Sequence, residues 1–580
     1  MKQNIRNLTA VTASLFFSST GALAQQPSRA ITPGNDQQVR QQEEARERAR
    51  TIAEPVVRSS SPPSAGFPSL PIETPCFRID RIALDVPASL PDAAKAQGAS
   101  ALPQDRFAFA REWLAHYDGV CIGKQGLDVL VKGLSQQILS RGYVTTRVLL
   151  PEQDLSTGTL KLALFPGAIR RIHFTDEQLW GTWKSAFPSR DGDLLNLRDL
   201  EQGLEQMKRV ASQDVSMQIV PTDMPGESDV VLDLNRGKPW TLVASIDNTG
   251  LRSTGKLQGH LAVGIDNPLG LNDIFNVGVS QDLALGDKRF GSHGWNGFYS
   301  IPWGYWSATL SAYTNTYSQQ IAGVNQTFVA SGNSKTVDIK LHRVLVRSHN
   351  DVFGLHFRLS RRFGQSFIED TEIPQQRRNN TFIEIGLTDR HYFGGAQFDG
   401  TLAYRQGIGA FGAQDDLLAD SGGPTYRYKM AVLDANLSVP FALAQQPFRY
   451  MSTFRGQYTG NPLYYIDDMA IGSRYTVRGF DGETMLAAAR GFYWRNELQM
   501  PIGQTGQVIY AGLDYGLVGG PQPVRLAGTQ LAGAVIGAKG SFATRLGAYA
   551  YEVFVGTPVY KPSGFSTARA TVGFQLTAQF

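Results

Sequence analysis

The sequence predicts a membrane β-barrel of sixteen antiparallel strands, preceded by two small α+β domains and a helical arm. Residues 570–580 alternate apolar and polar side chains and end on Phe580, and residues 239–580 contain many segments with the same alternation. A strand turns successive side chains to opposite faces, so each segment has one apolar and one polar face. A soluble strand can share this pattern, but its repetition favours a closed barrel with lipid outside and water inside.

Composition agrees with a barrel rather than a helical membrane protein. The chain has 580 residues, of which 42% are hydrophobic, and its mean hydropathy is -0.21. No run approaches the roughly 18 uncharged apolar residues that a membrane-spanning helix needs. The net charge of +4 is small for this length and argues against a nucleic-acid partner.

Residues 1–24 have the pattern of a secretory signal peptide. Lys2 and Arg6 precede an apolar stretch at 8–17, and the small residues Ala22–Ala24 follow as a cleavage site. A short buried helix is the alternative, but the sequence turns polar directly afterwards. We therefore expect export to an oxidising compartment.

The chain has two cysteines, Cys76 and Cys121, and in an exported protein one pair most simply forms one disulfide. Closing a loop of about 45 residues stabilises a fold by roughly 4 kcal/mol in the chain-entropy picture. Two unpaired thiols are the alternative. A metal site would need more ligands, so we predict no metal and no cofactor.

Residues 25–53 form an N-terminal arm whose second part, from residue 35, is helix-prone, with Asn35 or Asp36 available as a cap. Charged side chains lie all round this helix, which leaves it no apolar stripe to bury. It is either a solvated arm or a helix that lies in a polar, water-filled cavity. Residues 54–75 contain six prolines and read as an extended linker.

Two α+β units follow the linker, at 76–165 and 166–238. In the first we expect strands 77–84, 143–149 and 159–165 and helices 107–117 and 127–141. In the second we expect strands 169–174, 216–220 and 229–234 and helices 176–187 and 197–211. The shared order of elements predicts an internal repeat of architecture.

The last part of the chain, 239–580, is predicted to be the barrel. Its expected strands are 239–250, 256–266, 272–283, 291–302, 304–317, 334–348, 350–364, 377–391, 396–408, 426–440, 447–459, 489–501, 507–518, 529–541, 543–555 and 567–580. Short connections alternate with mostly longer ones, as in outer-membrane barrels with short periplasmic turns. An even number of strands returns both ends to the short-turn rim, which places the two small domains in the periplasm.

The longest connection, 460–488, contains Arg474-Tyr475-Thr476-Val477-Arg478-Gly479-Phe480. Combined with two α+β repeats and a sixteen-strand barrel, it resembles the VRGF/Y motif of the BamA superfamily. More narrowly, the chain resembles a two-partner secretion transporter of the TpsB type. The resemblance spans nearly the whole mature chain: plug helix, linker, two POTRA domains and barrel. The run Arg141-Gly142-Tyr143-Val144 is similar to the helix-to-strand passage of a POTRA domain.

The resemblance implies that the long loop folds back into the barrel and that its arginine, Arg478, meets an acidic residue on the wall. Alternation in 508–515 independently puts Asp514 on the lumen face, and Gly512-x-Asp514 matches the family's G-x-D strand motif, although Tyr510 replaces the usual Phe. Val477, Arg478, Gly479 and Phe480 would then form the loop tip. The alternative is a solvated loop arginine. Arg495 and Glu497 also face the lumen, where we interpret them as generic polar lining.

The resemblance further implies an outer-membrane pore that recognises an unfolded, large secreted partner of the TpsA type, a haemolysin, adhesin or toxin, and moves it to the cell surface. It implies a monomer in contact with outer-membrane lipid, and Phe580 would be read by the barrel-assembly machinery. An assembly or autotransporter translocation factor of the BamA superfamily is the alternative, and a passive porin is a weaker one.

The sequence contains no motif that supports an enzymatic function. Gly407–Gly412 matches GxGxxG after a strand, but no helix opens behind it to bind a pyrophosphate. The chain contains neither HExxH nor GxSxG. We therefore predict no catalytic residues.

Overall fold

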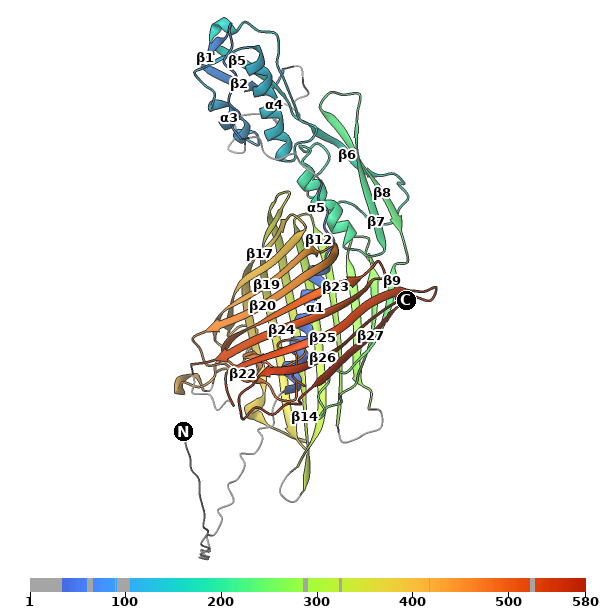
Figure 1. The fold of residues 1–580 in the computed structure, drawn as a ribbon. Helices are drawn as coiled ribbons and strands as arrows, with labels where there is room; N and C mark the ends of the chain where they lie inside the picture. The colour runs from blue at the N-terminus through green and yellow to red at the C-terminus, as the bar shows by residue number, and fades with distance from the viewer. Residues whose placement is uncertain are drawn as a thin grey trace, which may run out of the picture.

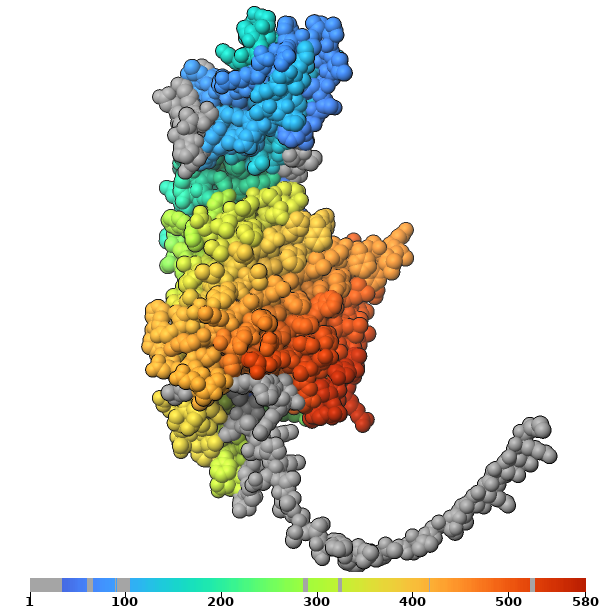
Figure 2. All heavy atoms as spheres, turned by 90° about the vertical axis from the view of Figure 1, so that its left-hand side faces the viewer, coloured from blue at the N-terminus to red at the C-terminus, as the bar shows by residue number. Residues whose placement is uncertain are grey.

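A computed structural model describes residues 34–59, 66–88, 90, 105–284, 290–322, 326–416, 418–521 and 527–580. The predicted signal peptide lies outside the described residues. Two small α+β units stand above one rim of a large barrel, and helix α1 (Gly34–Ala53) lies inside the barrel (Figure 1). In Figure 2 the blue first unit is farthest from the barrel and the cyan-to-green second unit lies between them.

The first unit builds one core from a sheet and two helices. Strand β5 (Thr159–Phe165) pairs in parallel with β2 (Arg81–Asp85) and antiparallel with β4 (Arg147–Leu149). Strands β1 (Phe77–Ile79) and β3 (Val120–Ile122) form a separate pair. Helices α3 (Ala108–Ala115) and α4 (Lys124–Ser140) bury apolar side chains at helical spacing against the sheet. The core includes Phe107, Trp113, Leu130, Leu134, Leu160 and Leu162.

The second unit has one α-helix rather than the two that the sequence predicts. Its sheet has the order β6 (Ala168–Phe174), β8 (Glu227–Arg236), β7 (Gln213–Pro221), and its helix is α5 (Leu197–Lys208). The helix expected at 176–187 is absent, so that prediction is wrong. Gly181 has a φ of 96°, which interrupts helical geometry, and Thr182 N donates to Gly270 O of the barrel at 2.9 Å. The segment is therefore a loop that the barrel rim holds through the backbone of Thr182.

The predicted sixteen-strand antiparallel barrel is confirmed. Its strands are β9 (Trp240–Asp247), β10 (Gln258–Asp266), β11 (Ile274–Asp282), β12 (Phe290–Trp303), β13 (Trp306–Ala322), β14 (Thr327–Arg347), β15 (Asp351–Ile368), β17 (Arg378–Phe393), β18 (Ala396–Ile408), β19 (Lys429–Leu443), β20 (Gln446–Thr459), β23 (Arg490–Ile502), β24 (Gln507–Gly519), β25 (Gln530–Ala543), β26 (Ala548–Tyr560) and β27 (Thr571–Gln579). The two-residue strand β16 (Thr371–Glu372) extends the hairpin loop after β15. The barrel closes where Gln575–Gln579 of β27 pair with Val243–Asp247 of β9.

Alternation along the strands separates the two faces of the barrel. On β10, Leu261, Val263 and Ile265 are exposed on the outside. On β11, Phe275, Val277 and Val279 are likewise exposed on the outside. Such outward apolar bands match the hydrocarbon layer of a membrane. Within the described residues, no helix is both long and apolar enough to cross a membrane.

The short connections gather at the rim next to the small domains. Gly304 and Tyr305 join β12 to β13, and Ala444 and Gln445 join β19 to β20. The long connections lie at the opposite rim (Figure 1). The longest of them, between β20 and β23, contains the paired strands β21 (Met469–Ile471) and β22 (Leu486–Ala488).

Candidate functional site

The loop between β21 and β22 turns into the lumen and brings Arg478 to the inner wall. Arg478 Nε donates to Asp514 Oδ2 at 2.7 Å, and its Nη2 donates to Asp514 Oδ1 at 2.9 Å. The backbone N–H of Arg478 donates to Asp514 Oδ2 at 2.9 Å. Both side chains are buried, each residue being 3% exposed. This two-pronged geometry is specific to a guanidinium, because an ammonium cannot present two parallel donors.

Glu497 of β23 completes the charge cluster, a role that the sequence interpretation of generic lining missed. Arg478 Nη1 donates to Glu497 Oε2 at 2.6 Å, and Lys539 Nζ donates to Glu497 Oε1 at 2.7 Å. Arg495 lies opposite Asp514 in the β23–β24 register, with its Nε 3.9 Å from Asp514 Oδ2. Pairing the two lumen-facing strands in this register would have revealed the cluster. Each buried charge thus has an opposite neighbour, which offsets the cost of its desolvation.

Glycines make room for the loop tip against the wall. Gly479 has a φ of 97°, and a Cβ on it would lie 2.5 Å from Thr557 O. A Cβ on Gly512 would lie 2.7 Å from Arg478 Nη2, and one on Gly533 would lie 1.8 Å from Arg478 O. The glycine of the Gly512-x-Asp514 motif therefore creates the space that the guanidinium occupies.

Apolar side chains add a second anchor to the loop. Val477 and Phe480 flank the arginine and are buried. They belong to a cluster that joins the loop to the wall strands and contains Met469, Ile471, Val477, Phe480, Leu486, Ala488, Tyr493, Val518, Leu531 and Phe565. Burying a side chain such as Val or Phe contributes about 1.5–3 kcal/mol. The tip is therefore held by both charge pairing and apolar packing.

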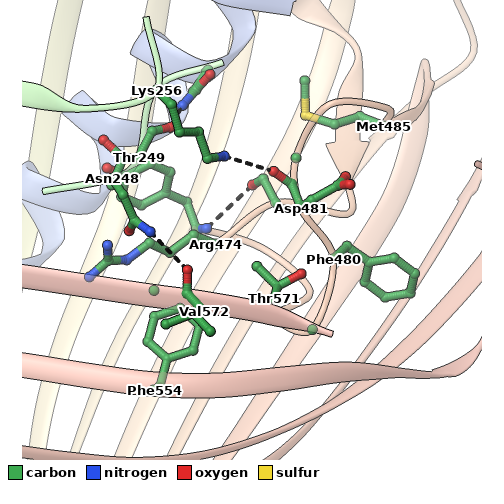
Figure 3. Close-up of a pocket in the computed structure, with 16 residues that line it drawn as sticks. Asn248, Thr249, Lys256, Arg474, Phe480, Asp481, Met485, Phe554, Thr571 and Val572 are labelled. Carbon is green, nitrogen blue, oxygen red and sulfur yellow. Dashed lines mark hydrogen bonds between the residues drawn. The ribbon is translucent and has the colours of Figure 1, made fainter. Parts of the chain in front are cut away.

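A pocket lies between the loop tip, β9 and β27 (Figure 3). Lys256 Nζ donates to Asp481 O at 3.3 Å across it. Asn248 Nδ2 donates to Val572 O at 2.8 Å, and Asn248 Oδ1 accepts from Phe574 N at 3.0 Å. The side chain of Asn248 thus extends the pairing of the closing strands beyond the end of β9.

Helix α1 fills the lumen beside the loop, and its five buried residues, Asn35, Asp36, Gln37, Arg40 and Gln41, are all polar. Among the residues that the structure describes, no hydrophobic cluster includes a side chain of α1. The helix instead makes ion pairs with the wall, from Asp36 to Arg378, from Glu44 to Arg455, and from Glu47 to Lys340 and Arg358. Of the two alternatives for the arm, the helix in a polar cavity is the one observed.

The helix and the loop also contact each other. Gln41 Nε2 donates to Ala470 O at 3.1 Å, and Ser473 Oγ donates to Gln41 Oε1 at 2.6 Å. Arg40 Nη2 donates to Asp468 O at 2.8 Å. The N-terminal half of the helix thus satisfies carbonyl groups at the base of the loop that carries Arg478.

The linker behind α1 is fixed where the second α+β unit meets the barrel. Arg347, at the end of β14, donates through Nη2 to Glu205 Oε2 of α5 at 2.6 Å and to Val57 O at 3.0 Å. Ser59 N donates to Glu201 Oε1 at 2.6 Å. The chain therefore leaves the lumen through a charged junction between α5 and the barrel rim.

The remaining residues singled out in the sequence lie away from this cluster. Cys76 and Cys121 form a disulfide in the first unit, with their Cα atoms 5.5 Å apart. Phe580 exchanges backbone hydrogen bonds with Leu242 of β9, and its ring lies edge-on to Tyr549 with the centroids 6.3 Å apart. The described residues contain no group of three or more His, Cys, Asp or Glu that could hold a metal ion.

Family models match three consecutive stretches of the chain between residues 93 and 540. Residues 226–540 match the family described as haemolysin secretion/activation protein ShlB/FhaC/HecB. Residues 168–221 match the POTRA domain, and residues 93–167 match its ShlB-type form.

Individual relatives match over most of their length. The outer membrane transporter CdiB-2 of Burkholderia pseudomallei is 71% identical over 545 residues, which cover 94% of this chain and 93% of that protein. The hemolysin transporter protein HpmB of Proteus mirabilis is 28% identical over 66% of this chain and 67% of its own. The solved structure of CdiB from Acinetobacter baumannii is 26% identical and superposes with a TM-score of 0.80, covering 94% of this chain and 99% of that one.

Proposed function

The chain belongs to the haemolysin secretion/activation family of ShlB, FhaC and HecB, and from this premise we propose that it exports one large secreted protein to the cell surface. It resides in the outer membrane, with its POTRA domains in the periplasm. Relatives that are named as outer-membrane and haemolysin transporters support this transport role. The expected client is a TpsA-type haemolysin, adhesin or toxin that crosses unfolded.

The contrast between α1 and the Arg478 loop carries the proposal. The lumen is occupied by a helix whose buried residues are all polar, next to a loop anchored by a buried ion pair and an apolar cluster. Polar contacts exchange for contacts with water at small net cost, about 0.5–1.5 kcal/mol each. A pore that must open for a polypeptide and close afterwards needs a segment that can leave the lumen, here α1, beside a segment that stays, here the Arg478 loop.

The client would be captured in the periplasm by strand addition. In the second POTRA domain, β6 and β7 are the edge strands of a three-stranded sheet. Edge strands present unpaired backbone groups that an extended chain can pair with. This mode suits a client that has not folded before it crosses. We propose that folding of the client outside the cell prevents its return.

Co-expression tests the proposal. A bacterial host that lacks other transporters of this family would express the chain with a candidate TpsA-type client. We expect that protein at the cell surface or in the medium, and we expect it in the periplasm when the transporter is omitted. Periplasmic retention in both cases would contradict export. Loss of other assembled outer-membrane barrels when the chain is depleted would instead support an assembly factor.

We further propose that Phe580 is read by the barrel-assembly machinery. It directly follows the closing strand β27, and 39% of its surface is exposed on the barrel. Deleting Phe580 is expected to lower the amount of assembled barrel in the membrane, measured by heat-modifiable gel mobility. Replacing Phe580 by Tyr keeps an aromatic end and should preserve assembly. An unchanged level in the deletion variant would contradict this role.

The chain must also be exported, processed and assembled before it can work. We propose that residues 1–24 direct export and are removed, and that the barrel works as a monomer surrounded by outer-membrane lipid. The disulfide between Cys76 and Cys121 would stabilise the first POTRA domain in the oxidising periplasm. No cofactor or catalytic role is part of this proposal.

A further inference from the structure

Residues 175–184 of the second POTRA domain form a loop that we call the Trp180 loop. It is fixed at the height of the periplasmic barrel rim. Thr182 N donates to Gly270 O at 2.9 Å, and Asn272 Nδ2 donates to Thr182 O at 2.7 Å. Both barrel residues belong to the turn between β10 and β11. The loop therefore lies next to the point where the lipid-facing strands of that hairpin end.

The tip of this loop presents a large apolar side chain to its surroundings. Trp180 is 65% exposed, although its indole covers Gly270, where a Cβ would lie 3.3 Å from the ring. Leu269, in the same barrel turn, is 60% exposed. Packing inside the described protein therefore leaves most of the Trp180 ring without an apolar neighbour, and adjoining apolar exposure of this kind marks a contact surface.

The surrounding side chains have the composition of a membrane interface. Trp240 begins β9 at the same rim, and Lys238 Nζ lies 3.2 Å from the centre of its ring. Trp303, the last residue of β12, is also exposed. Tryptophan is enriched at the headgroup level of membranes, and lysine can reach from there to phosphate groups.

We propose that the Trp180 loop rests in the headgroup region of the periplasmic leaflet, so that lipid is a binding partner of the second POTRA domain as well as of the barrel. The lipid-facing band supports this occupant, because Ile265 and Phe275 are outward-facing residues of the hairpin whose turn contacts Trp180. The contact would fix the tilt of the edge strands β6 and β7 relative to the membrane. An unfolded client is the competing occupant.

Headgroup quenching tests the contact. The full-length protein would carry an environment-sensitive dye on Gln178→Cys, next to Trp180, and be reconstituted in phosphatidylethanolamine vesicles that contain lipids with spin-labelled headgroups. Cys76 and Cys121 are joined and do not compete for the dye. The matched control is Met224→Cys in the turn after β7. Ser212, just before β7, bonds to Asp266 at the rim, and the nine residues of β7 carry the chain about 30 Å along the strand from there.

Without any client present, we expect severalfold stronger quenching of the dye at 178 than at 224. Adding Trp180→Ser to the Gln178→Cys variant should clearly weaken the quenching at 178, although the hydrogen bonds of Thr182 still hold the loop at the rim. Heat-modifiable mobility would verify that every variant is assembled. Equal quenching at both positions, or quenching at 178 that is unchanged by Trp180→Ser, would overturn the proposal and leave the exposed indole to a protein partner.

Discussion

The Arg478 loop and helix α1 lie next to each other in the lumen, but the loop buries apolar side chains and the helix buries only polar ones. Val477 and Phe480 pack into a cluster that reaches across several wall strands. The buried residues of α1 make hydrogen bonds and ion pairs instead. Water can replace polar contacts, but it cannot replace apolar packing. The difference indicates a fixed loop and a displaceable helix, although both obstruct the same pore.

The strongest test of the fixed loop is Arg478→Ala. Removing one partner of a buried ion pair costs about 3–5 kcal/mol. Here, among the described residues, it leaves Asp514 with only the more distant Arg495 as a counter-charge, at 3.9 Å. We expect secretion of the client to fall to near background while the barrel still inserts. Secreted client and heat-modifiable barrel would be measured in the same cells.

Two further arginine variants control this test. Arg478→Lys keeps the charge but cannot form the two-pronged bond to Asp514, so it should also impair secretion. Arg545→Ala, in an exposed turn, should leave secretion unchanged. Secretion at the wild-type level by Arg478→Ala would show that the ion pair is dispensable.

Deleting residues 34–53 tests the displaceable helix. Since α1 contributes no residue to an apolar cluster of the described chain, we expect the barrel to assemble normally and its ion conductance in planar bilayers to rise manyfold. A deletion variant that no longer assembles would mean that the helix is part of the folded core. A conductance equal to that of the intact protein would mean that the loop alone closes the pore.

A smaller effect is expected when only the charges that hold the helix are removed. Glu47 pairs with Lys340 and Arg358 of the wall, whereas Glu43 pairs with Arg46 of its own helix. Each partly exposed pair contributes up to about 1 kcal/mol, so Glu47→Gln, which removes two pairs, should raise the ratio of open to closed pores by about thirtyfold at most. Glu43→Gln should have no effect, since its pair moves with the helix. Single-channel recordings would compare the Glu47→Gln and Glu43→Gln variants. Equal open fractions in the two variants would contradict the view that Glu47 holds the helix to the wall.

High salt should reduce the effect of Glu47→Gln, because exposed pairs are screened while apolar packing is not. The wild-type protein and the Glu47→Gln variant should therefore be recorded at both low and high ionic strength. A difference that is independent of salt would point to lost packing rather than lost charge.

The sequence predicted the barrel and the loop better than it predicted the helix contacts. Strand alternation is local, so sixteen strands and the lumen face of Asp514 follow from the residues themselves. The role of Glu497 depends on register between strands, which fixes its distance from Arg478. The helix expected at 176–187 is missing because Gly181 has a positive φ and Thr182 bonds to the rim turn at Gly270. The glycine is a local signal, whereas the bond to the rim is a tertiary effect that the sequence does not show. The partners of α1 are more than two hundred residues away in sequence, so no spacing pattern could identify them.

The claim that α1 must leave while the loop stays is tested most directly by joining the two. Gln41→Cys and Ser473→Cys, whose native side chains are hydrogen-bonded, would be bridged by a short reducible thiol linker in assembled protein. A control with the linker but only one new cysteine would receive the same reductant, since the native disulfide is also exposed to it. We predict that the bridged protein keeps a low conductance and exports no client until the bridge is reduced. Export at the control level with the bridge intact would contradict the account.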